Sequence, residues 1–331
     1  MNLLTGSTGL VGAHVLAQLI FNKKKTRALY RTEEKREQTL AVLYNYQISK
    51  DEIEAYVEWQ IADILNLPQL EEAFIGIKHV YHCAGFISNS PSDYKKMRKI
   101  NIEGASNMVN LSLHFKIHKF CHVSSIAALG KPLNSKHITE DSPLAEDSKP
   151  SAYEISKYGA EMEVWRASQE GLDVVIVNPG IILGDGFYDS GSGALLNKLK
   201  NGLKVYPPKT TAFVGVYDVA KIMILLMESP VKNQRYILAS ENLSFKQVAT
   251  HFSRLYNVSK PQLKLKPWML YVAWIFEVLR SFLTPYKRQL TLDVISSLFE
   301  TSYYSSEKLK NEFGFEFEKL EDYAKTIKDR A

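Results

Sequence analysis

The sequence is poor in cysteine, because two of its 331 residues, Cys83 and Cys121, carry a thiol. Two thiols cannot cross-link a secreted scaffold of this length, so we expect a reducing, cytoplasmic environment. The sequence also lacks a large excess of charge of either sign. Its 41 lysines and arginines and 36 acidic residues leave a formal net charge of +5. Such a mild excess, spread along the chain, argues against nucleic-acid binding.

Long apolar runs and metal-ligand spacings are also lacking. Residues 1–6 have neither the charged region nor the long apolar region of a signal peptide, so secretion is not expected. Residues 268–283 are apolar apart from Glu277, Arg280 and Ser281, but they fall short of the roughly 20 residues that a membrane-spanning helix needs. The eight histidines show no ligand spacing, so we expect no metal and expect His82 and His122 to be packed and neutral.

The composition is that of a globular protein, with 45% apolar and 23% charged residues. A chain of this length exceeds the size of one hydrophobic core, so we expect a large domain and a smaller one. Up to residue 180, short apolar runs alternate with helical patterns, which predicts a parallel α/β sheet. The predicted strands are residues 1–4, 26–30, 56–61, 79–82, 120–123 and 174–177, and residues 33–48 are predicted to be helical.

The pattern changes after residue 180. Residues 184–193 are rich in glycine and serine and predict a loop into a second region. A further strand is predicted at 236–238, and helical patterns dominate from residue 244. We therefore predict an α/β fold with a Rossmann doubly wound parallel sheet in residues 1–180 and about 211–238. A smaller, mostly helical C-terminal substrate domain would comprise about 181–210 and 239–331.

Three glycines stand three residues apart directly after the first predicted strand. Glycine permits a tight turn, lets the backbone approach a pyrophosphate and lets helix and strand pack closely. The N-terminus of the following helix presents free N–H groups and a positive dipole end to the phosphates. The loop therefore predicts a dinucleotide site, with the candidate contacts Gly6, Ser7, Thr8, Gly9, Leu10, Val11 and Gly12.

The end of the second predicted strand indicates which dinucleotide binds. An acidic residue there binds the ribose 2′-hydroxyl of NAD, whereas an arginine accommodates the 2′-phosphate of NADP. Here Arg31 follows the strand, Lys35 and Arg36 are near, and no acid precedes Glu33, so we expect NADP(H) in preference to NAD(H). Asp63 is a candidate acceptor for the adenine amino group. Further candidate contacts lie at the ends of later strands: Ile64, Cys83, Ala84, Gly85, Pro179, Gly180 and Ile182.

A tyrosine and a lysine, Tyr153 and Lys157, lie at i and i+4 and therefore on one face of a predicted helix. An unperturbed phenol has a pKa near 10, too high for a base at neutral pH, and a nearby ammonium group lowers that pKa. The pair alone is a weak signal. It is supported by the glycine loop and by the serines Ser124 and Ser125, which follow the strand predicted at 120–123.

Together these motifs resemble the extended short-chain dehydrogenase/reductase family. The likeness rests on TGxxGxxG at 5–12, on a serine ahead of the loop at 126–130 and on YxxxK at 153–157. It implies that Tyr153 is the proton donor or acceptor, and that Lys157 holds the nicotinamide ribose and tunes the tyrosine. Both residues therefore also count as cofactor contacts.

The same resemblance implies a serine that hydrogen-bonds the reacting oxygen. Counted back from Gly130, the family's SSxxxxG spacing selects Ser125 over Ser124. Asn101 falls at the position of the family's helix-four asparagine, which implies a structural or water-relay role beside the cofactor.

Flanking residues indicate a branch of this family. Dehydratases carry an acid pair just after the serine or threonine, and this chain has Ile126 and Ala127 there. Sugar-nucleotide enzymes usually show RPxNVxGP after the sixth strand, whereas Asn178 and Ile181 replace the arginine and the diphosphate-binding asparagine here. An isoleucine facing a diphosphate would leave a polar group without a hydrogen bond. The sequence looks instead like dihydroflavonol-4-reductase-type and aldehyde or ketone reductases.

We therefore expect an NADP(H)-dependent oxidoreductase that reversibly reduces an aldehyde or ketone of an apolar small molecule. One alternative is a nucleotide-sugar epimerase that uses the same Ser–Tyr–Lys set. The other is a regulatory protein that binds NADP(H) without turnover, although such relatives often lose the tyrosine.

The apolar segment 268–283 has its own alternatives. Lys260, Lys264 and Lys266 precede it and Lys287 and Arg288 follow, a pattern that suits an interfacial helix on an anionic membrane surface. A helix that is apolar nearly all round fits burial better. We therefore expect it to be buried against the core, an apolar substrate or the second subunit of a homodimer.

Overall fold

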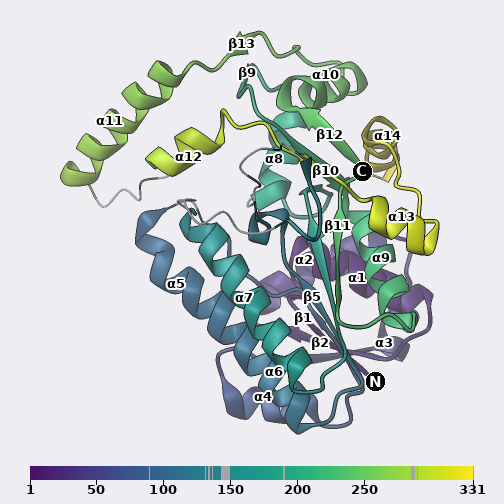
Figure 1. Cartoon of the computed structure of the whole chain (residues 1–331). Helices are drawn as coiled ribbons and strands as arrows, with labels where there is room; N and C mark the ends of the chain where they lie inside the picture. Colours follow the sequence, from purple (N-terminus) through teal and green to yellow (C-terminus); the bar gives the residue numbers. More distant parts are fainter. Residues whose placement is uncertain are drawn as a thin grey trace.

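The computed structural model describes residues 1–88, 90–130, 132, 135, 137–142, 150–188, 191–284, 288 and 290–330. Its centre is a seven-stranded sheet in the order β11-β7-β5-β4-β1-β2-β3, in which all neighbours run parallel (Figure 1). The strands are β1 (Asn2–Thr5), β2 (Thr26–Tyr30), β3 (Val57–Ile61), β4 (His79–His82), β5 (Lys119–Val123), β7 (Val174–Pro179) and β11 (Gln234–Leu238). The strand order reverses between β1 and β4, which confirms the doubly wound sheet and puts its crevice beyond the ends of these two strands.

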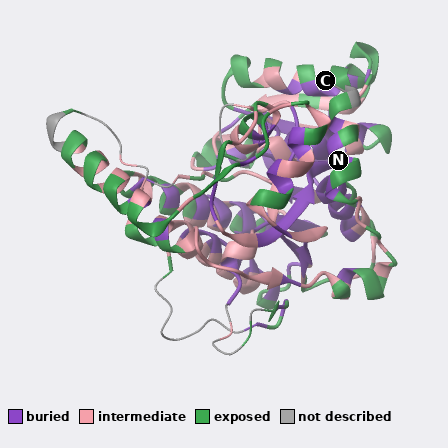
Figure 2. Cartoon of the chain, turned by 90° about the horizontal axis from the view of Figure 1, so that it is seen from above, coloured by how far each residue is buried: buried purple, intermediate pink, exposed green. Residues whose placement is uncertain are grey.

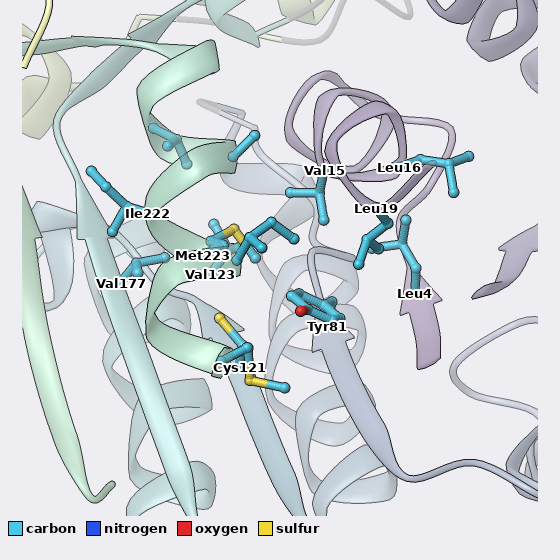
Figure 3. Close-up of a cluster of buried hydrophobic side chains, with 14 of the residues drawn as sticks. Leu4, Val15, Leu16, Leu19, Tyr81, Cys121, Val123, Val177, Ile222 and Met223 are labelled. Carbon is cyan, nitrogen blue, oxygen red and sulfur yellow. The ribbon is translucent and has the colours of Figure 1, made fainter. Parts of the chain in front are cut away.

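Helices cover both faces of the sheet (Figure 1). One face carries α1 (Leu10–Phe21), α2 (Glu33–Asn45), α3 (Lys50–Tyr56) and α9 (Val216–Glu228). The other carries α4 (Leu67–Phe74), α5 (Tyr94–Arg98), α6 (Gly104–His114) and α7 (Ala152–Gln169), with the short helical turns η1 (Pro91–Asp93), η2 (Lys99–Glu103) and η3 (Ile126–Ala128). The first core lies where α1 and α9 meet the sheet, and Figure 3 shows Val15, Leu19, Tyr81 and Met223 converging there.

A second region lies over the carboxyl ends of these strands (Figure 1). Its strands are β6 (His137–Ile138), β8 (Ile181–Leu183), β9 (Val205–Tyr206), β10 (Thr210–Gly215), β12 (Glu241–Ser244), β13 (Leu263–Lys264) and β14 (Tyr303–Tyr304). Its helices are α8 (Gly191–Lys200), α10 (Phe245–Leu255), α11 (Pro267–Leu283), α12 (Leu292–Ser297), α13 (Glu307–Phe313) and α14 (Leu320–Arg330). The prediction of a smaller, mainly helical C-terminal part is confirmed.

Two local predictions are wrong. The helix predicted over 33–48 ends at Asn45, since Gln47 adopts a φ of +61° and Ser49 starts α3 with a capping box formed with Glu52. Tyr56 accordingly ends α3 and does not open a strand. The loop predicted at 184–193 is interrupted by α8, which begins at Gly191; residues 189 and 190 of that prediction lie outside the described residues.

Of the expected alternatives for 268–283, burial against the core is wrong for one side of α11, whereas burial against a substrate or a second subunit stays a prediction. Trp268 and Phe276 are 61% and 68% exposed, and the outer side of the helix faces solvent (Figure 2). The periodicity of a sequence does not show whether other parts of the protein pack against an apolar helix. In this chain α11 extends past the body of the molecule (Figure 1). Within the described chain, no helix has both the length and the apolar character that crossing a membrane requires.

Candidate active site

The glycine loop joins β1 to α1 at the crevice of the sheet. Gly6 has a φ of +67°, and a Cβ on it would lie 2.6 Å from the backbone nitrogen of Ala84. A Cβ on Gly12 would lie 2.0 Å from the carbonyl oxygen of Gly6, so the fold itself requires both glycines. A Cβ on Gly9 would meet that same oxygen at 3.5 Å, an ordinary contact. The described chain therefore does not require glycine at position 9, which leaves room there for a bound group.

The N-terminus of α1 suits a pyrophosphate. Gly9 is the N-cap, and no side chain in the described part of the chain caps the first N–H groups or places an acid in the first turn. Free N–H groups at the positive end of a helix bind anions. The Ser7 hydroxyl is buried and donates to the Leu29 carbonyl at 2.6 Å, so Ser7 could reach a ligand only through its backbone. Thr8, Leu10 and Val11 complete the predicted loop and are partly buried.

Arg31 and Asp63 lie together at the ends of neighbouring strands. The Arg31 guanidinium is 69% exposed, and its Nη1 lies 3.8 Å from Asp63 Oδ2. Asp63 Oδ1 accepts the Leu65 N–H at 2.9 Å, which fixes the turn after β3. The Ile64 side chain packs against Gly104 in the core, so it points into the protein.

The structure brings Ser125, Tyr153 and Lys157 together. Helix α7 begins at Ser151, whose capping box with Glu154 sets the register that puts Tyr153 and Lys157 on one face. The Ser125 side chain lies near enough to the Tyr153 hydroxyl to lower the pKa of that phenol. Lys157 Nζ donates to the Val123 carbonyl oxygen at 3.0 Å, so the lysine reaches the end of β5, next to the serine.

Burial sets the protonation of this trio. It raises the pKa of the Tyr153 phenol above its ordinary value, while the nearby Ser125 side chain opposes the rise. Burial also lowers the pKa of Lys157 to about 8, and the nearby Cys83 and Glu161 oppose that change. At neutral pH the site therefore holds a neutral phenol and, one turn further along α7, a charged ammonium group, a combination suited to giving a proton.

Asn101 connects the helices around the site. Its Oδ1 accepts the Phe86 N–H at 2.7 Å, and its Nδ2 donates to the Phe86 carbonyl at 3.0 Å and to Ser156 Oγ at 3.0 Å. A Cβ on Gly85 would lie 3.5 Å from Asn101 Oδ1 and 3.6 Å from Lys157 Nζ. The asparagine thus ties the loop after β4 to α7, next to the lysine, as a structural role would require.

The turn after β7 is held by backbone contacts. Pro179 ends β7 and is buried, and the Gly180 N–H donates to the Leu238 carbonyl at 2.9 Å. A Cβ on Gly180 would lie 2.5 Å from the Ala212 carbonyl oxygen. Ile182, in β8, is half-buried against the core around α1. Their contacts with a cofactor stay predictions.

The thiols and the buried imidazoles are packed groups. His82 and His122 stack with ring centroids 5.3 Å apart, and burial lowers both pKa values, that of His82 to about 3, so both are neutral as predicted. Cys83 and Cys121 are free thiols; Cys83 directly follows β4, Cys121 is the middle residue of the neighbouring β5, and burial raises the pKa of Cys121 to about 12. Neither thiol is an activated nucleophile.

The sequence analysis missed a buried carboxylate, Glu161, behind the candidate site. Its Oε2 accepts hydrogen bonds from Ser124 Oγ at 2.6 Å and from Asn178 Nδ2 at 2.9 Å. Its Oε1 accepts from Trp165 Nε1 at 3.2 Å and pairs with Arg235 Nη1 at 2.9 Å. The carboxylate is fully buried, so these four donors compensate for its desolvation.

This network reaches Ser125 through its backbone. Asn178 Nδ2 also donates to the Ser125 carbonyl oxygen at 3.0 Å, which links Glu161 to the segment that carries the serine. One sequence signal could have identified Glu161: it follows Lys157 by four residues, so it lies on the same face of the helix, one turn further on.

Comparisons with known proteins agree with this arrangement. The profile of the NAD dependent epimerase/dehydratase family matches residues 2–239. A protein of Synechocystis sp. provisionally named a dihydroflavonol 4-reductase is 27% identical over 320 residues, which cover 94% of this chain and 88% of that one. Sterol demethylase protein B of Methylococcus capsulatus is 26% identical over 271 residues, covering 81% of this chain and 78% of that one.

A solved structure described as gox2253 is similar over 100% of this chain and 97% of its own, with a TM-score of 0.80 and 26% identity. The family match spans the sheet, the glycine loop and the serine, tyrosine and lysine described above. The chain belongs to the NAD-dependent epimerase/dehydratase family, and it is an NAD(P)-dependent oxidoreductase of the extended short-chain dehydrogenase/reductase type.

Proposed function

We propose that the protein uses NADPH to reduce the carbonyl group of an apolar aldehyde or ketone, and that it oxidises the alcohol in reverse. The observation that carries this proposal is that Ser125 lies near the Tyr153 hydroxyl just after β5, where Lys157 Nζ donates to the Val123 carbonyl oxygen at 3.0 Å. Tyr153 supplies a neutral acid, Ser125 a second hydrogen-bonding group and Lys157 a cation at the same end of β5.

The bound dinucleotide supplies the hydride for the carbonyl carbon. Tyr153 donates its phenolic proton to the carbonyl oxygen, which yields the alcohol and a phenolate. Ser125 hydrogen-bonds that oxygen and stabilises the negative charge that develops on it. Lys157 stabilises the phenolate by its charge and holds the ribose, while Asn101 keeps the lysine and α7 in place.

The residues around the trio favour reduction over the alternative chemistries. Ile126 and Ala127 follow Ser125 and offer no acid or base for an elimination. The Asn178 amide is engaged by the Ser125 carbonyl and by Glu161, so it is not free to bind a sugar diphosphate. Ile181 is apolar where sugar-nucleotide enzymes place an asparagine. We assign substrate contacts to about 181–210 and 239–331, and we place the protein in a reducing cytoplasm, which suits its free thiols.

The charges at the end of β2 support a preference for NADPH. Arg31 is exposed and available to a 2′-phosphate. The nearest acid in sequence, Glu33, accepts the Tyr30 hydroxyl at 2.7 Å and pairs with Arg36 at 2.9 Å, so its carboxylate is already engaged.

The test is an assay of aldehydes, ketones, sterols and nucleotide sugars with NADPH and with NADH. We expect carbonyl turnover with NADPH, and a loss of about 10²–10⁴-fold in Tyr153→Phe while NADPH still binds. Ser125→Ala should lower kcat, whereas Ser112→Ala, whose buried hydroxyl donates to the Met108 carbonyl at 2.7 Å within α6, is the matched control. Retained turnover in Tyr153→Phe, or turnover of UDP-sugars alone, would refute the proposal.

Cofactor choice is tested separately. Arg31→Ala should raise the Kd for NADPH by roughly tenfold and leave that for NADH unchanged, because a charge-assisted hydrogen bond is lost only with NADPH. Equal effects on both dinucleotides would contradict the NADP preference while leaving the reductase chemistry standing.

A further inference from the structure

Helix α11 extends away from the body of the molecule, and many of its residues are exposed to solvent (Figure 2). Six exposed side chains recur at helical spacing: Trp268, Tyr271, Val272, Ile275, Phe276 and Leu279, with exposed fractions from 44% to 68%. We call these six the apolar face of α11. Leu270, on the opposite side, is buried. Exposed apolar patches of this kind mark interaction surfaces.

Positive charge flanks the apolar face at both ends. Lys264 and Lys266 precede it and Arg280 ends it, and all three are exposed. Glu277 is the acidic residue of the segment 260–284, and its Oε2 accepts the Leu290 N–H at 2.9 Å, so it is bonded to the chain that follows the helix. Of the basic pair predicted to follow, Arg288 is half-buried and Lys287 lies outside the described residues.

We propose that α11 docks on the surface of an anionic lipid bilayer and lies in the plane of the interface. Its apolar face would enter the boundary between headgroups and acyl chains, and its flanking cations would contact anionic headgroups. Trp268 and Tyr271 suit that depth, because each ring has an apolar body and a polar edge.

Charge argues against a second copy of the chain as the partner. If two α11 helices paired antiparallel, Arg280 of each copy would approach the lysines that precede the helix in the other. If they paired parallel, like charges would lie side by side. Glu277 is the acid of this helix, and its helical spacing puts it on the side opposite the apolar face, away from a helix paired there. An anionic surface neutralises these cations, whereas self-association concentrates them.

The direct test is sedimentation of the full-length protein with vesicles. With equal parts phosphatidylcholine and phosphatidylglycerol the protein should sediment, and with phosphatidylcholine alone it should bind less. Brominated acyl chains should quench part of its tryptophan fluorescence, and Trp268→Phe should remove that part. Failure to bind anionic vesicles at low salt would overturn the proposal.

Variants locate the contact. Phe276→Asp combined with Leu279→Asp should lower the partition coefficient by about a hundredfold, since two buried apolar side chains are lost. Lys264→Glu and Lys266→Glu should each lower binding to anionic vesicles by about fivefold or more. Ile75→Asp is the matched control, because Ile75 is 62% exposed and ends α4, at the opposite end of the molecule (Figure 1).

Two outcomes would assign the face to something else. Unchanged vesicle binding in the Phe276/Leu279 variant would place the membrane contact outside α11. A dimer in sedimentation velocity that this variant dissociates, without vesicle binding, would assign the face to a second copy. Neither result depends on the proposed reductase chemistry, which is measured separately with water-soluble carbonyl substrates.

Discussion

Tyr153 and Lys157 lie one turn apart on α7, and burial moves their pKa values in opposite directions. The phenol becomes a weaker acid and stays neutral, whereas the ammonium group loses its proton more readily than an exposed lysine would. The difference matters for catalysis, because reduction needs the phenol protonated at the start and a cation beside the phenolate at the end.

The reductase rate should therefore depend on the charge of Lys157. Below pH about 8 the ammonium is charged, and above it the charge is lost, since burial lowers that pKa from its ordinary value. We expect kcat/KM for carbonyl reduction to fall as the pH rises through about 8, because this parameter reports the free enzyme. Initial rates over pH 6–10 measure it, with fluorescence at each pH to exclude unfolding. A flat profile up to pH 10 would contradict the assignment.

The contacts of Asn178 with Glu161 and with the Ser125 carbonyl predict that Glu161 positions Ser125. Glu161→Leu removes the carboxylate that pairs with Arg235, whose Nε still donates to the Glu140 carbonyl at 2.8 Å, and breaking a buried pair of this kind costs about 3–5 kcal/mol of the free energy of unfolding. Glu161→Gln keeps acceptor and donor atoms at the position and should cost less. Both variants should lower kcat more than they raise the KM for the dinucleotide, with Gln the milder.

The control for Glu161 is a surface pair. Lys232 and Asp173 form an ion pair at 3.3 Å with side chains 59% and 40% exposed, so Asp173→Asn should cost less than about 1 kcal/mol. Urea denaturation and steady-state kinetics measure both variants. If Glu161→Gln kept wild-type kcat, the link from Glu161 to the serine would have no role in turnover.

At the scale of elements, local patterns predicted what local chemistry determines. The strands of the central sheet, the glycine loop and the Tyr153–Lys157 face of α7 all follow from short-range spacing. The break before α3 could not be predicted in this way. It depends on a positive φ at Gln47, and glutamine is not a residue type that favours that conformation.

Hydrogen-bond and ion-pair partners that lie far apart in the chain could not be predicted from the sequence either. Arg235 meets Glu161 across 74 positions of chain, and Asn178 finds Ser125 across 53. Such pairs arise from the order of strands in the sheet, where β5, β7 and β11 are neighbours. The exposure of α11 is a similar case, since periodicity shows an apolar helix but not whether anything covers it.

The glycine loop offers a paired test of fold against binding. Gly12→Ala would place a Cβ 2.0 Å from the Gly6 carbonyl oxygen, so we expect it to lose both stability and dinucleotide affinity. Gly9→Ala meets that atom at 3.5 Å and has a φ of −121°, so its melting temperature should stay close to wild type. Its dinucleotide affinity should still fall about tenfold or more, because the methyl group occupies the space given to the pyrophosphate.

Calorimetry and dinucleotide titration of the two variants together measure this difference. Wild-type affinity in Gly9→Ala would show that the dinucleotide does not approach Gly9. A large loss of stability in Gly9→Ala would show that the loop is packed more tightly than its contacts indicate.

At the scale of the whole molecule, the two regions share one interior. Tyr323 of α14 is fully buried, and its hydroxyl donates to the Leu183 carbonyl at 2.8 Å and accepts the Val216 N–H at 3.2 Å. Its ring fills the space that a Cβ on Gly215 would take. The C-terminal helix therefore supports the start of α9, one of the helices that cover the sheet.

This sharing predicts that both regions unfold together. Tyr323→Ala should cost about 3–5 kcal/mol by leaving a cavity, and Tyr323→Phe should cost about 1–3 kcal/mol by leaving two buried backbone groups unpaired. Tyr44→Ala, at a 50% exposed tyrosine, should change stability by less than about 0.5 kcal/mol. Denaturation followed by tryptophan fluorescence and by circular dichroism should give coincident transitions in every variant. Separate transitions in Tyr323→Ala, with NADPH raising the midpoint of one alone, would mean that the dinucleotide-binding sheet folds without α14 and that the C-terminal region only rests upon it.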